Sequence, residues 1–289
     1  MAQLGGELMG KVKVCDDRSR LTNFPLVSVL FVTYKRPELL KEALVSFRKH
    51  TDYPNLELIV ADDGSPRHIQ EDIRALPFDK FALASKNRGL GANNNQGMNV
   101  ATGKYILMIQ DDRHCAGPSD YLEKAVRLLE ANPQVGLLNF SGPAHIKDDR
   151  IMLADNDAGD FHVVKLAPLA VKREYLYTDE PHIMTAVAFG YVGPYKEDRD
   201  MERCEDNYMR RWEAQRLFAT VINGKHHDEV FVNVGIARSF RENRFRYRVD
   251  RLLLPIGKRL KTRSPKLFVM GRFLARLPAR LLEKLRIVR

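Results

Sequence analysis

The sequence predicts an α/β fold in which helices flank a mostly parallel β-sheet. Two observations lead to this prediction. Runs of six to eight mainly apolar residues, rich in valine, isoleucine and leucine, recur along the first half of the chain. Between them lie segments whose apolar residues are spaced three or four apart, as on one face of a helix. Strands that alternate with helices in this way form parallel sheets with right-handed crossovers.

The first strand and the first helix have the clearest pattern. Residues 26–33 form a continuous apolar, partly β-branched run, which is typical of a strand buried on both faces. Pro37 follows at a position that suits the first turn of a helix. The helix expected there has an apolar stripe that consists of Leu39, Leu40, Ala43, Leu44 and Phe47.

The other elements are weaker or less regular. The turn sequence Asp63-Gly64-Ser65-Pro66 ends the second run, and a segment rich in glycine and asparagine at 87–103 precedes the fourth. Helices are expected at 118–131, from its apolar stripe, and at about 205–216. The remaining strands are expected at 56–62, 80–85, 104–109, 135–140, 163–171 and 217–222.

The bulk composition indicates an ordinary globular protein of 289 residues, with 44% hydrophobic and 29% charged residues. No run approaches the roughly 18 to 20 apolar residues that a transmembrane helix needs. The start of the sequence lacks the apolar run of a signal peptide. The three cysteines are scattered and form no CxxC pair, as expected in a reducing cytosol. We therefore expect a cytoplasmic location.

Polar side chains follow each of the first four predicted strands. The carboxyl ends of parallel strands meet at one edge of a sheet, where such folds bind their ligands. The sequence therefore predicts one binding site at that edge. Its candidate residues are Tyr34 to Arg36, Asp62-Asp63, Asn87-Arg88 and Asp111-Asp112.

The adjacent carboxylates Asp111 and Asp112 need a neighbouring cation, because two like charges side by side repel each other. Their hard oxygen ligands favour Mg²⁺ or Mn²⁺, which commonly bridges a diphosphate. The alternative is a solvated turn, because paired aspartates are common in loops.

The segment from Val27 to about Gly142 resembles the inverting family 2 glycosyltransferases, which have a GT-A fold with a Rossmann-like sheet. A weaker match continues into the second half, so that the resemblance covers roughly 200 residues. The matching motifs are VSVLFVTYKRPELLKEAL (27–44), VADDGS (60–65), NRGLGANNNQGMNVATGKYILMIQDD (87–112) and GPYKED…CEDNYMRRW (193–212).

The resemblance implies an organisation in four parts. An N-terminal arm at 1–24 precedes a nucleotide-sugar-binding half at 25–140. An acceptor-binding half at 141–235 follows, and a basic helical tail at 236–289 ends the chain.

The resemblance also implies roles for the donor-site residues. Tyr34 lies where the family packs against the nucleobase, and Asp63 where a carboxylate accepts a hydrogen bond from the base, often uracil. Arg36 and Arg88 are expected near the nucleotide. Asp111 would face the ribose, and Asp112 would hold the metal. Gln110 stands where the family usually has an aspartate, which puts the metal affinity in question.

Glu205-Asp206 matches the family's ED motif, which implies a general base. We expect Asp206 to take the proton of the acceptor hydroxyl, and Glu205 to contact the acceptor or support the site. Capping of a helix N-terminus is the alternative role for this pair. His226 or His227 is a candidate further metal ligand, and a surface histidine pair is the alternative.

The tail at 250–289 carries twelve basic and two acidic residues, so it holds the whole net charge of +10. Its last 23 residues place leucines on one helical face and arginines on another, a pattern typical of a helix that lies on an anionic membrane. A helix packed on the catalytic domain, with its basic face solvated, is the alternative. Nucleic acid is a third, weaker alternative, because no RNA-binding motif appears.

The sequence thus predicts a metal-assisted transferase for polysaccharide biosynthesis. It would move a sugar, with UDP-sugars favoured as donors, to a glycan or lipid-linked acceptor at the inner face of the membrane. Two alternatives stay open. One is a catalytically degenerate GT-A protein that acts as a membrane-associated assembly partner, which Gln110 favours. The other is a sugar-nucleotide pyrophosphorylase, which the absence of an early glycine-rich loop disfavours.

Overall fold

The structure is a computed structural model that describes residues 23–140, 161–164, 177, 179–198, 200–215, 219–223 and 230–235. The chain divides into two units, Met1–Asn233 and Val234–Arg289. The fold described below belongs to the first unit. The predicted N-terminal arm, apart from its last two residues, and the basic tail lie outside the described residues.

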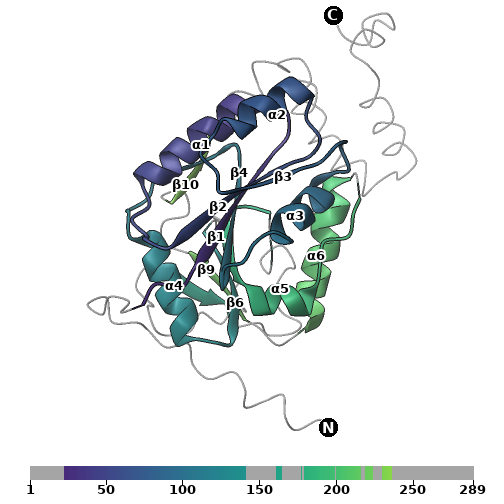
Figure 1. Ribbon diagram of the computed structural model, residues 1–289. Helices are drawn as coiled ribbons and strands as arrows, with labels where there is room; N and C mark the ends of the chain where they lie inside the picture. Colours follow the sequence, from purple (N-terminus) through teal and green to yellow (C-terminus); the bar gives the residue numbers. More distant parts are fainter. Residues whose placement is uncertain are drawn as a thin grey trace, which may run out of the picture. The chain divides into compact units, whose positions relative to one another are not determined.

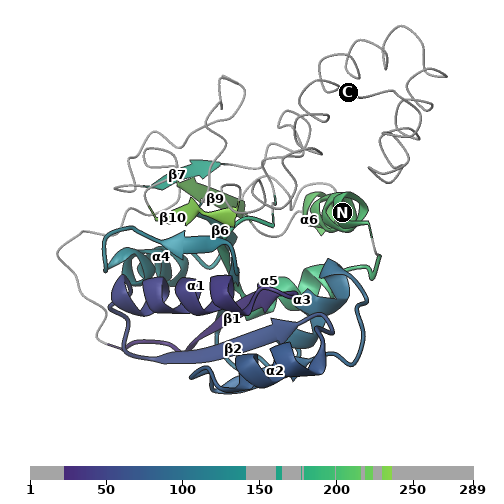
Figure 2. The same ribbon diagram turned by 90° about the horizontal axis from the view of Figure 1, so that it is seen from above.

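The described residues form an eight-stranded sheet with the order β3-β2-β1-β4-β8-β6-β9-β7, and a separate two-stranded sheet, β10-β5. Figure 2 shows β2 on one side of the molecule and β9 and β7 on the other. The strands are β1 (Val27–Thr33), β2 (Leu56–Asp62), β3 (Lys80–Leu83), β4 (Tyr105–Gln110), β5 (Arg113–Cys115), β6 (Val135–Asn139), β7 (Phe161–Val164), β8 (His182–Thr185), β9 (Ala219–Asn223) and β10 (Phe231–Asn233).

Six helices complete the described fold, three on each face of the large sheet. Figure 1 shows α1 and α4 on one side of the sheet and α3, α5 and α6 on the other. The helices are α1 (Pro37–Lys49), α2 (Arg67–Arg74), α3 (Leu90–Met98), α4 (Tyr121–Ala131), α5 (Ala186–Val192) and α6 (Met201–Gln215).

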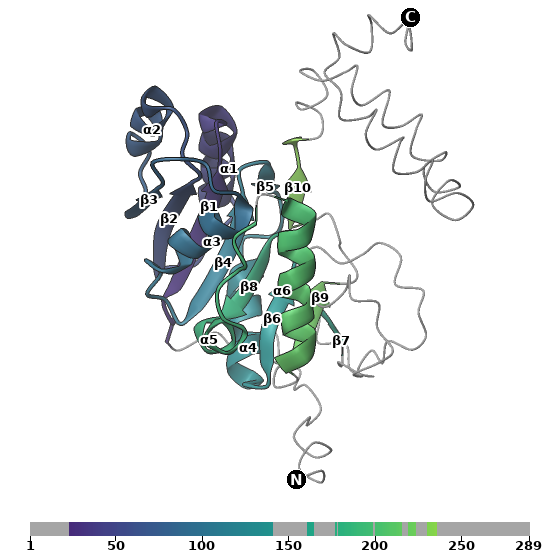
Figure 3. The same cartoon turned by 90° about the vertical axis from the view of Figure 1, so that its right-hand side faces the viewer.

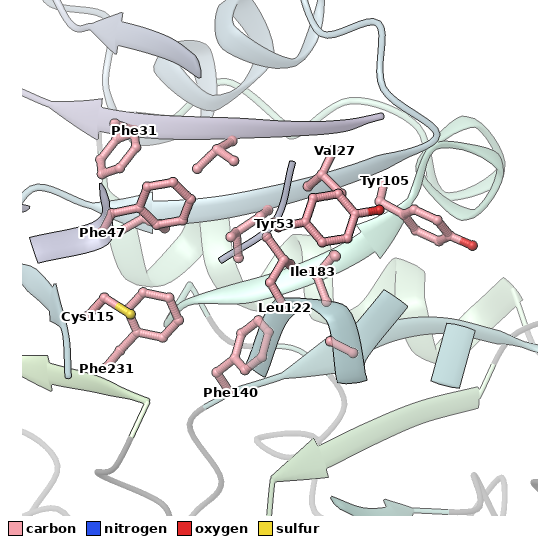
Figure 4. Close-up of a cluster of buried hydrophobic side chains, with 14 of the residues drawn as sticks. Val27, Phe31, Phe47, Tyr53, Tyr105, Cys115, Leu122, Phe140, Ile183 and Phe231 are labelled. Atoms are coloured by element: carbon pink, nitrogen blue, oxygen red, sulfur yellow. The ribbon is translucent and has the colours of Figure 1, made fainter. Parts of the chain in front are cut away.

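The side chains of alternate strand residues form two cores, one on each face. Val29 and Phe31 of β1 pack with α1, α2 and α4, and a part of this core is drawn in Figure 4. Leu30 and Val32 of the same strand pack with α3, α5 and α6. All seven residues of β1 are buried because the strand is covered on both faces, as its unbroken apolar run predicts.

The predicted elements of the first half are confirmed. Helix α1 begins at Pro37, and its five buried residues are the five of the predicted stripe. Strands β1, β2 and β4 pair in parallel, and Thr33 lies opposite Asp62. The predicted α/β fold with a mostly parallel sheet is therefore correct.

The second half joins the same sheet with partly antiparallel pairing. Strand β8 inserts between β4 and β6 and runs antiparallel to both. Figure 3 shows α6 lying across β8 and β6. Helix α6 begins four residues before its predicted start, β9 lies close to its predicted range, and β7 overlaps the strand predicted at 163–171 only at its beginning.

Several elements have no clear sequence pattern, and α3 is the most important of them. Its sequence, LGANNNQGM, is poor in apolar residues, yet most of the helix is buried. Tertiary hydrogen bonds take the place of an apolar face. Asn93 donates to the carbonyl oxygens of Thr33 and Ala61, and Asn95 exchanges two hydrogen bonds with the backbone of Tyr195. The other elements without a clear pattern are α2, β5, β8, α5 and β10.

No helix within the described ranges is long and apolar enough to cross a membrane.

Candidate functional site

The predicted site lies at the carboxyl edge of the parallel strands. Because β1, β2 and β4 run in parallel, their ends lie together: Thr33 lies opposite Asp62, and Gln110 lies opposite Val32, one residue earlier. The chain leaves β4 through Asp111 and Asp112, whose neighbours come from the end of β1 and from the start of α1.

Arg36 binds both carboxylates of the aspartate pair. Its guanidinium approaches the two carboxylate oxygens of Asp111 at 2.6 and 3.0 Å, and Asp112 Oδ2 at 3.4 Å. The hydroxyl of Thr33 donates a further hydrogen bond to Asp111 at 2.7 Å. The cation that the adjacent carboxylates require is therefore supplied, in the described structure, by the chain itself.

Asp111 and Asp112 differ in exposure and so in availability. The side chain of Asp111 is completely buried, whereas that of Asp112 keeps 22% of its surface exposed. Burial raises the pKa of the Asp111 carboxyl to about 6, against the opposing effect of Arg36 and Thr33. Among the described residues, Asp112 has long contacts to arginines, at 3.4 Å from Arg36 and 3.9 Å from Arg113. Its oxygens therefore remain available to a ligand.

Asp63 is held by the loop that follows β3. Its carboxylate accepts hydrogen bonds from the side chain of Asn87 at 2.7 Å and from the backbone N–H groups of Arg88 and Gly89 at 2.8 and 2.9 Å. Burial raises the pKa of this carboxyl, although the two backbone N–H groups oppose that shift. A carboxylate accepts about four hydrogen bonds, so one position remains for a ligand N–H.

Tyr34 and Arg88 lie at the rim of the same edge. Tyr34 is partly buried, and the ammonium of Lys35 lies 4.8 Å from the centre of its ring. Lys35 has a positive φ of 59°, which turns the chain sharply between β1 and α1. The guanidinium of Arg88 lies 3.6 Å from the carboxylate of Glu197. The structure therefore gathers all the predicted donor-site residues around the strand ends.

Glu205 and Asp206 lie on α6, but not at its first turn. The helix begins at Met201, so the alternative role of the pair as helix caps is wrong, and stabilisation by the helix N-terminus is weaker than expected. Glu205 accepts a hydrogen bond from the backbone N–H of Asp179 at 3.0 Å. Asp206 is half-exposed and forms an ion pair with Arg210, one helical turn further along.

The residues of this site lie in a segment that matches a known protein family. Residues 28–158 match the family described as glycosyl transferase family 2. This chain carries a family 2 glycosyltransferase domain. The matched segment contains the strand ends, the aspartate pair and the Asp63 loop described above, and the resemblance expected from the sequence motifs is confirmed.

Curated relatives match over a part of the chain. An uncharacterized glycosyltransferase of Methanocaldococcus jannaschii is 36% identical over 119 residues, which cover 39% of this chain and 40% of that protein. A GalNAc(5)-diNAcBac-PP-undecaprenol β-1,3-glucosyltransferase of Campylobacter jejuni is 30% identical over 93 residues, or 30% of each chain. The match with this chain thus spans well under half of the length of these relatives.

Solved structures share the fold over a larger part of the chain. A mannosyltransferase of Pyrobaculum calidifontis, in complex with GDP-Man and Mn²⁺, has a TM-score of 0.54 at 20% identity and covers 81% of this chain and 65% of that one. Staphylococcus aureus TarS, in complex with UDP-GlcNAc, has a TM-score of 0.54 at 16% identity and covers 71% and 57%. The glycosyltransferase domain therefore has the GT-A fold, as the sequence predicts.

The predicted metal ligands are only partly described. His226 and His227 lie outside the described residues. Within the described part of the glycosyltransferase domain, no three histidine, cysteine or acidic side chains gather to hold a metal. Asp112 nevertheless fits Mn²⁺ or Mg²⁺, because these ions are often held by one or two carboxylates together with the phosphates of a substrate.

Gln110 and Arg113 flank the aspartate pair in the sequence, and both side chains are at least partly buried beside it. The side-chain oxygen of Gln110 is buried and has no hydrogen-bond partner among the described residues. It is therefore an acceptor that a ligand hydroxyl could satisfy. Arg113 is largely buried and forms an ion pair with Glu180.

Asp179 and Glu180 were not predicted as site residues. They precede β8, and the start of β8 lies at the ligand edge only because this strand is antiparallel to β4, with His182 opposite Met108. In a parallel sheet only the residues that follow a strand lie at the ligand edge, so residues that precede a strand are not expected there. The adjacent acidic pair was the one sequence signal that could have indicated them.

Proposed function

We propose that the protein transfers a sugar from a nucleoside-diphosphate sugar to a hydroxyl group of a glycan or lipid-linked acceptor. The observation that carries this proposal is the aspartate pair at the carboxyl edge of the sheet, inside a family 2 glycosyltransferase domain. Two proteins of similar fold form complexes with GDP-Man and with UDP-GlcNAc, which supports a donor of this class. We favour UDP-sugars because Asp63 keeps one acceptor position for a base N–H.

The described side chains suit the parts of such a donor. Tyr34 and Asp63 would hold the base, and the unpartnered oxygen of Gln110 would accept a hydrogen bond from a donor hydroxyl. Arg36 lies beside the aspartate pair, and its planar guanidinium would bind the oxygens of the diphosphate. Asp112 would hold Mn²⁺ or Mg²⁺, which neutralises the charge of the leaving diphosphate when it is bound.

We further propose that the transfer inverts the anomeric configuration. A carboxylate takes the proton of the acceptor hydroxyl as its oxygen attacks the anomeric carbon, on the face opposite the diphosphate. The sequence motif nominates Asp206 for this role. Polysaccharide or lipid-linked saccharide biosynthesis, at the inner face of a membrane, is the process that such an acceptor implies.

Hydrolysis of nucleotide sugars by the full chain tests the donor class. With Mn²⁺ present, we expect slow release of nucleoside diphosphate from at least one of UDP-glucose, UDP-GlcNAc, UDP-galactose and GDP-mannose. Chelation of the metal should slow it on the order of 100-fold. Binding of UDP without turnover of any donor would favour the alternative of a non-catalytic assembly partner. Synthesis of UDP-glucose from UTP and glucose 1-phosphate would instead indicate a pyrophosphorylase.

Membrane association through residues 250–289 is a separate proposal that rests on charge and helical spacing alone. We expect the full chain to sediment with vesicles containing phosphatidylserine, and not with neutral phosphatidylcholine vesicles. Removal of residues 250–289 should abolish sedimentation and leave UDP binding unchanged. Because each basic residue near an anionic surface contributes about 1 kcal/mol, raised salt should also release the full chain. Binding that is independent of salt would contradict this proposal.

A further inference from the structure

Glu180, in the turn before β8, contacts two polar side chains at the ligand edge of the sheet. Its carboxylate forms an ion pair with Arg113, the first residue of β5. Its backbone carbonyl oxygen lies 2.8 Å from Nδ1 of His182, the first residue of β8. Strands β5 and β8 belong to different sheets, so Glu180 connects two side chains that no local pattern would group.

His182 is fixed as a hydrogen-bond acceptor. A carbonyl oxygen can only accept, so Nδ1 of His182 carries the proton and donates to Glu180, and Nε2 keeps a free lone pair. Burial lowers the pKa of His182 to about 4, although the hydrogen bond to Glu180 opposes the shift, so the ring is neutral at pH 7. Nε2 is buried and has no hydrogen-bond partner among the described residues.

Two further buried polar atoms lie near His182 and Asp112. Asn139 is directly opposite His182 in the pairing of β6 with β8, so both side chains lie on the same face of the sheet. Neither the side-chain oxygen of Asn139 nor Nε of Arg113 has a hydrogen-bond partner in the described part of the chain. Nε of Arg113 is 3.9 Å from Asp112, beyond hydrogen-bond distance. Nearly all buried polar atoms in folded proteins are hydrogen-bonded, so these atoms indicate a ligand or ordered water.

The three atoms together define the chemistry of that ligand. Nε of Arg113 donates a hydrogen bond, whereas Nε2 of His182 and Oδ1 of Asn139 accept one. A phosphate oxygen would satisfy the donor alone, and a cation would satisfy the acceptors alone. A hydroxyl group both donates and accepts, so a molecule with several hydroxyl groups satisfies all three.

The order of the strands relates these atoms to the parts of the donor. Along the sheet, β2 and β1 end before Asp63 and Tyr34, β4 ends before the aspartate pair, and β8 and β6 come next. A nucleoside-diphosphate sugar has its base, its diphosphate and its sugar in this same order. Neighbouring strands lie about 4.8 Å apart, so a sugar attached to a diphosphate at Asp112 would lie beside β8 and β6.

We propose that Arg113, His182 and Asn139 form the subsite for the transferred sugar and bind it through its hydroxyl groups. The inference rests on the proposed transferase function and names the residues that select the sugar. One hydroxyl oxygen accepts the hydrogen bond of Arg113 Nε. Hydroxyl protons of the same ring are donated to His182 Nε2 and to Asn139 Oδ1.

The test is calorimetric titration of the full chain at saturating Mn²⁺. The ligands are the four donor sugars named above and the nucleoside diphosphate of the donor that binds most tightly. This diphosphate lacks the sugar, so its Kd reports the donor site without the proposed subsite. We expect His182→Leu and Arg113→Lys each to weaken binding of the sugar donor about tenfold. Both should leave the Kd of the diphosphate within about twofold of the wild type.

Conservative variants separate hydrogen bonding from packing and charge. His182→Gln provides an amide oxygen near the position of Nε2, so it should retain more affinity for the sugar donor than His182→Leu does. Arg113→Lys keeps the positive charge beside Asp112 and loses the planar guanidinium, so its weaker binding would not be an effect of charge.

Arg127→Gln is the matched control. Arg127 is also a largely buried arginine, but it lies on α4, which packs on the face of the sheet opposite α3, α5 and α6. Its replacement should change neither the Kd of the sugar donor nor that of the diphosphate. Thermal unfolding without ligands shows whether each variant is folded.

Unchanged affinity for the sugar donor in folded His182→Leu or Arg113→Lys would overturn the assignment, because the atoms would then bind ordered water only. Equal weakening of the sugar donor and the diphosphate would also overturn it. A wild type that binds a donor and does not hydrolyse it would contradict the proposed transferase function and leave the subsite standing. A wild type that binds none of the four donors would contradict both.

Discussion

Replacement of Asp112 with asparagine is expected to lower donor turnover by about 100-fold at limiting Mn²⁺. Asp112 is the partly exposed member of the aspartate pair, and its arginine contacts at 3.4 and 3.9 Å leave its oxygens available. An amide keeps the size of the side chain and removes the charge that attracts a divalent cation. The measurement is release of nucleoside diphosphate from the donor sugar as a function of Mn²⁺ concentration.

Asp120→Asn is the matched control for this variant. Asp120 also forms an ion pair with a basic residue, Lys124, but it lies on the exposed surface at the start of α4. Its replacement should change turnover by less than about twofold and stability by less than about 1 kcal/mol. A half-saturating Mn²⁺ concentration that is the same in Asp112→Asn and in the wild type would contradict a role for Asp112 in metal binding.

Replacement of Gly97 with alanine is expected to destabilise the fold by about 2 kcal/mol. Gly97 lies where α3 packs on β1 and β2, and an added Cβ would approach Leu30 Cδ1 to 2.3 Å and Ala61 Cβ to 3.1 Å. Leu30 is completely buried, so its side chain has no free space into which to move. The measurement is the free energy of unfolding from urea denaturation.

Gly190→Ala is the same substitution at an open position. Gly190 lies within α5, and, apart from its chain neighbours and the backbone of its own helix, no atom of the described residues lies within 4 Å of the Cβ that alanine would add. Alanine favours a helix over glycine by about 1 kcal/mol, so this variant should be as stable as the wild type or more stable. If the two variants had equal stability, close packing of α3 on the sheet would not be the reason for Gly97.

The elements that the sequence predicts well are those whose own residues carry the reason for their structure. Strand β1 and helix α1 are examples, because a buried strand needs an unbroken apolar run and a helix on a sheet needs an apolar stripe. Helix α3 is the opposite case. Its asparagines are poor helix formers, and it is held by hydrogen bonds to β1, β2 and the backbone of Tyr195, which lies 100 residues from Asn95 in the chain.

The candidate site divides in the same way. Strand-end positions indicate Tyr34, Arg36, Asp63 and Asp111 because parallel strands carry their carboxyl ends to one edge. No sequence motif predicts the contact of Arg36 with both aspartates, because it depends on the path of the chain between β1 and α1.

The sequence by itself determined the fold class, the family and the edge of the sheet where ligands are expected, since each depends on local patterns of apolar and polar residues. Only the tertiary structure decided that Asp179 and Glu180 join this edge. They precede a strand rather than follow one, and β8 reaches the edge because it pairs antiparallel with β4. The direction of a strand within its sheet is set by packing between distant segments, so no local pattern encodes it.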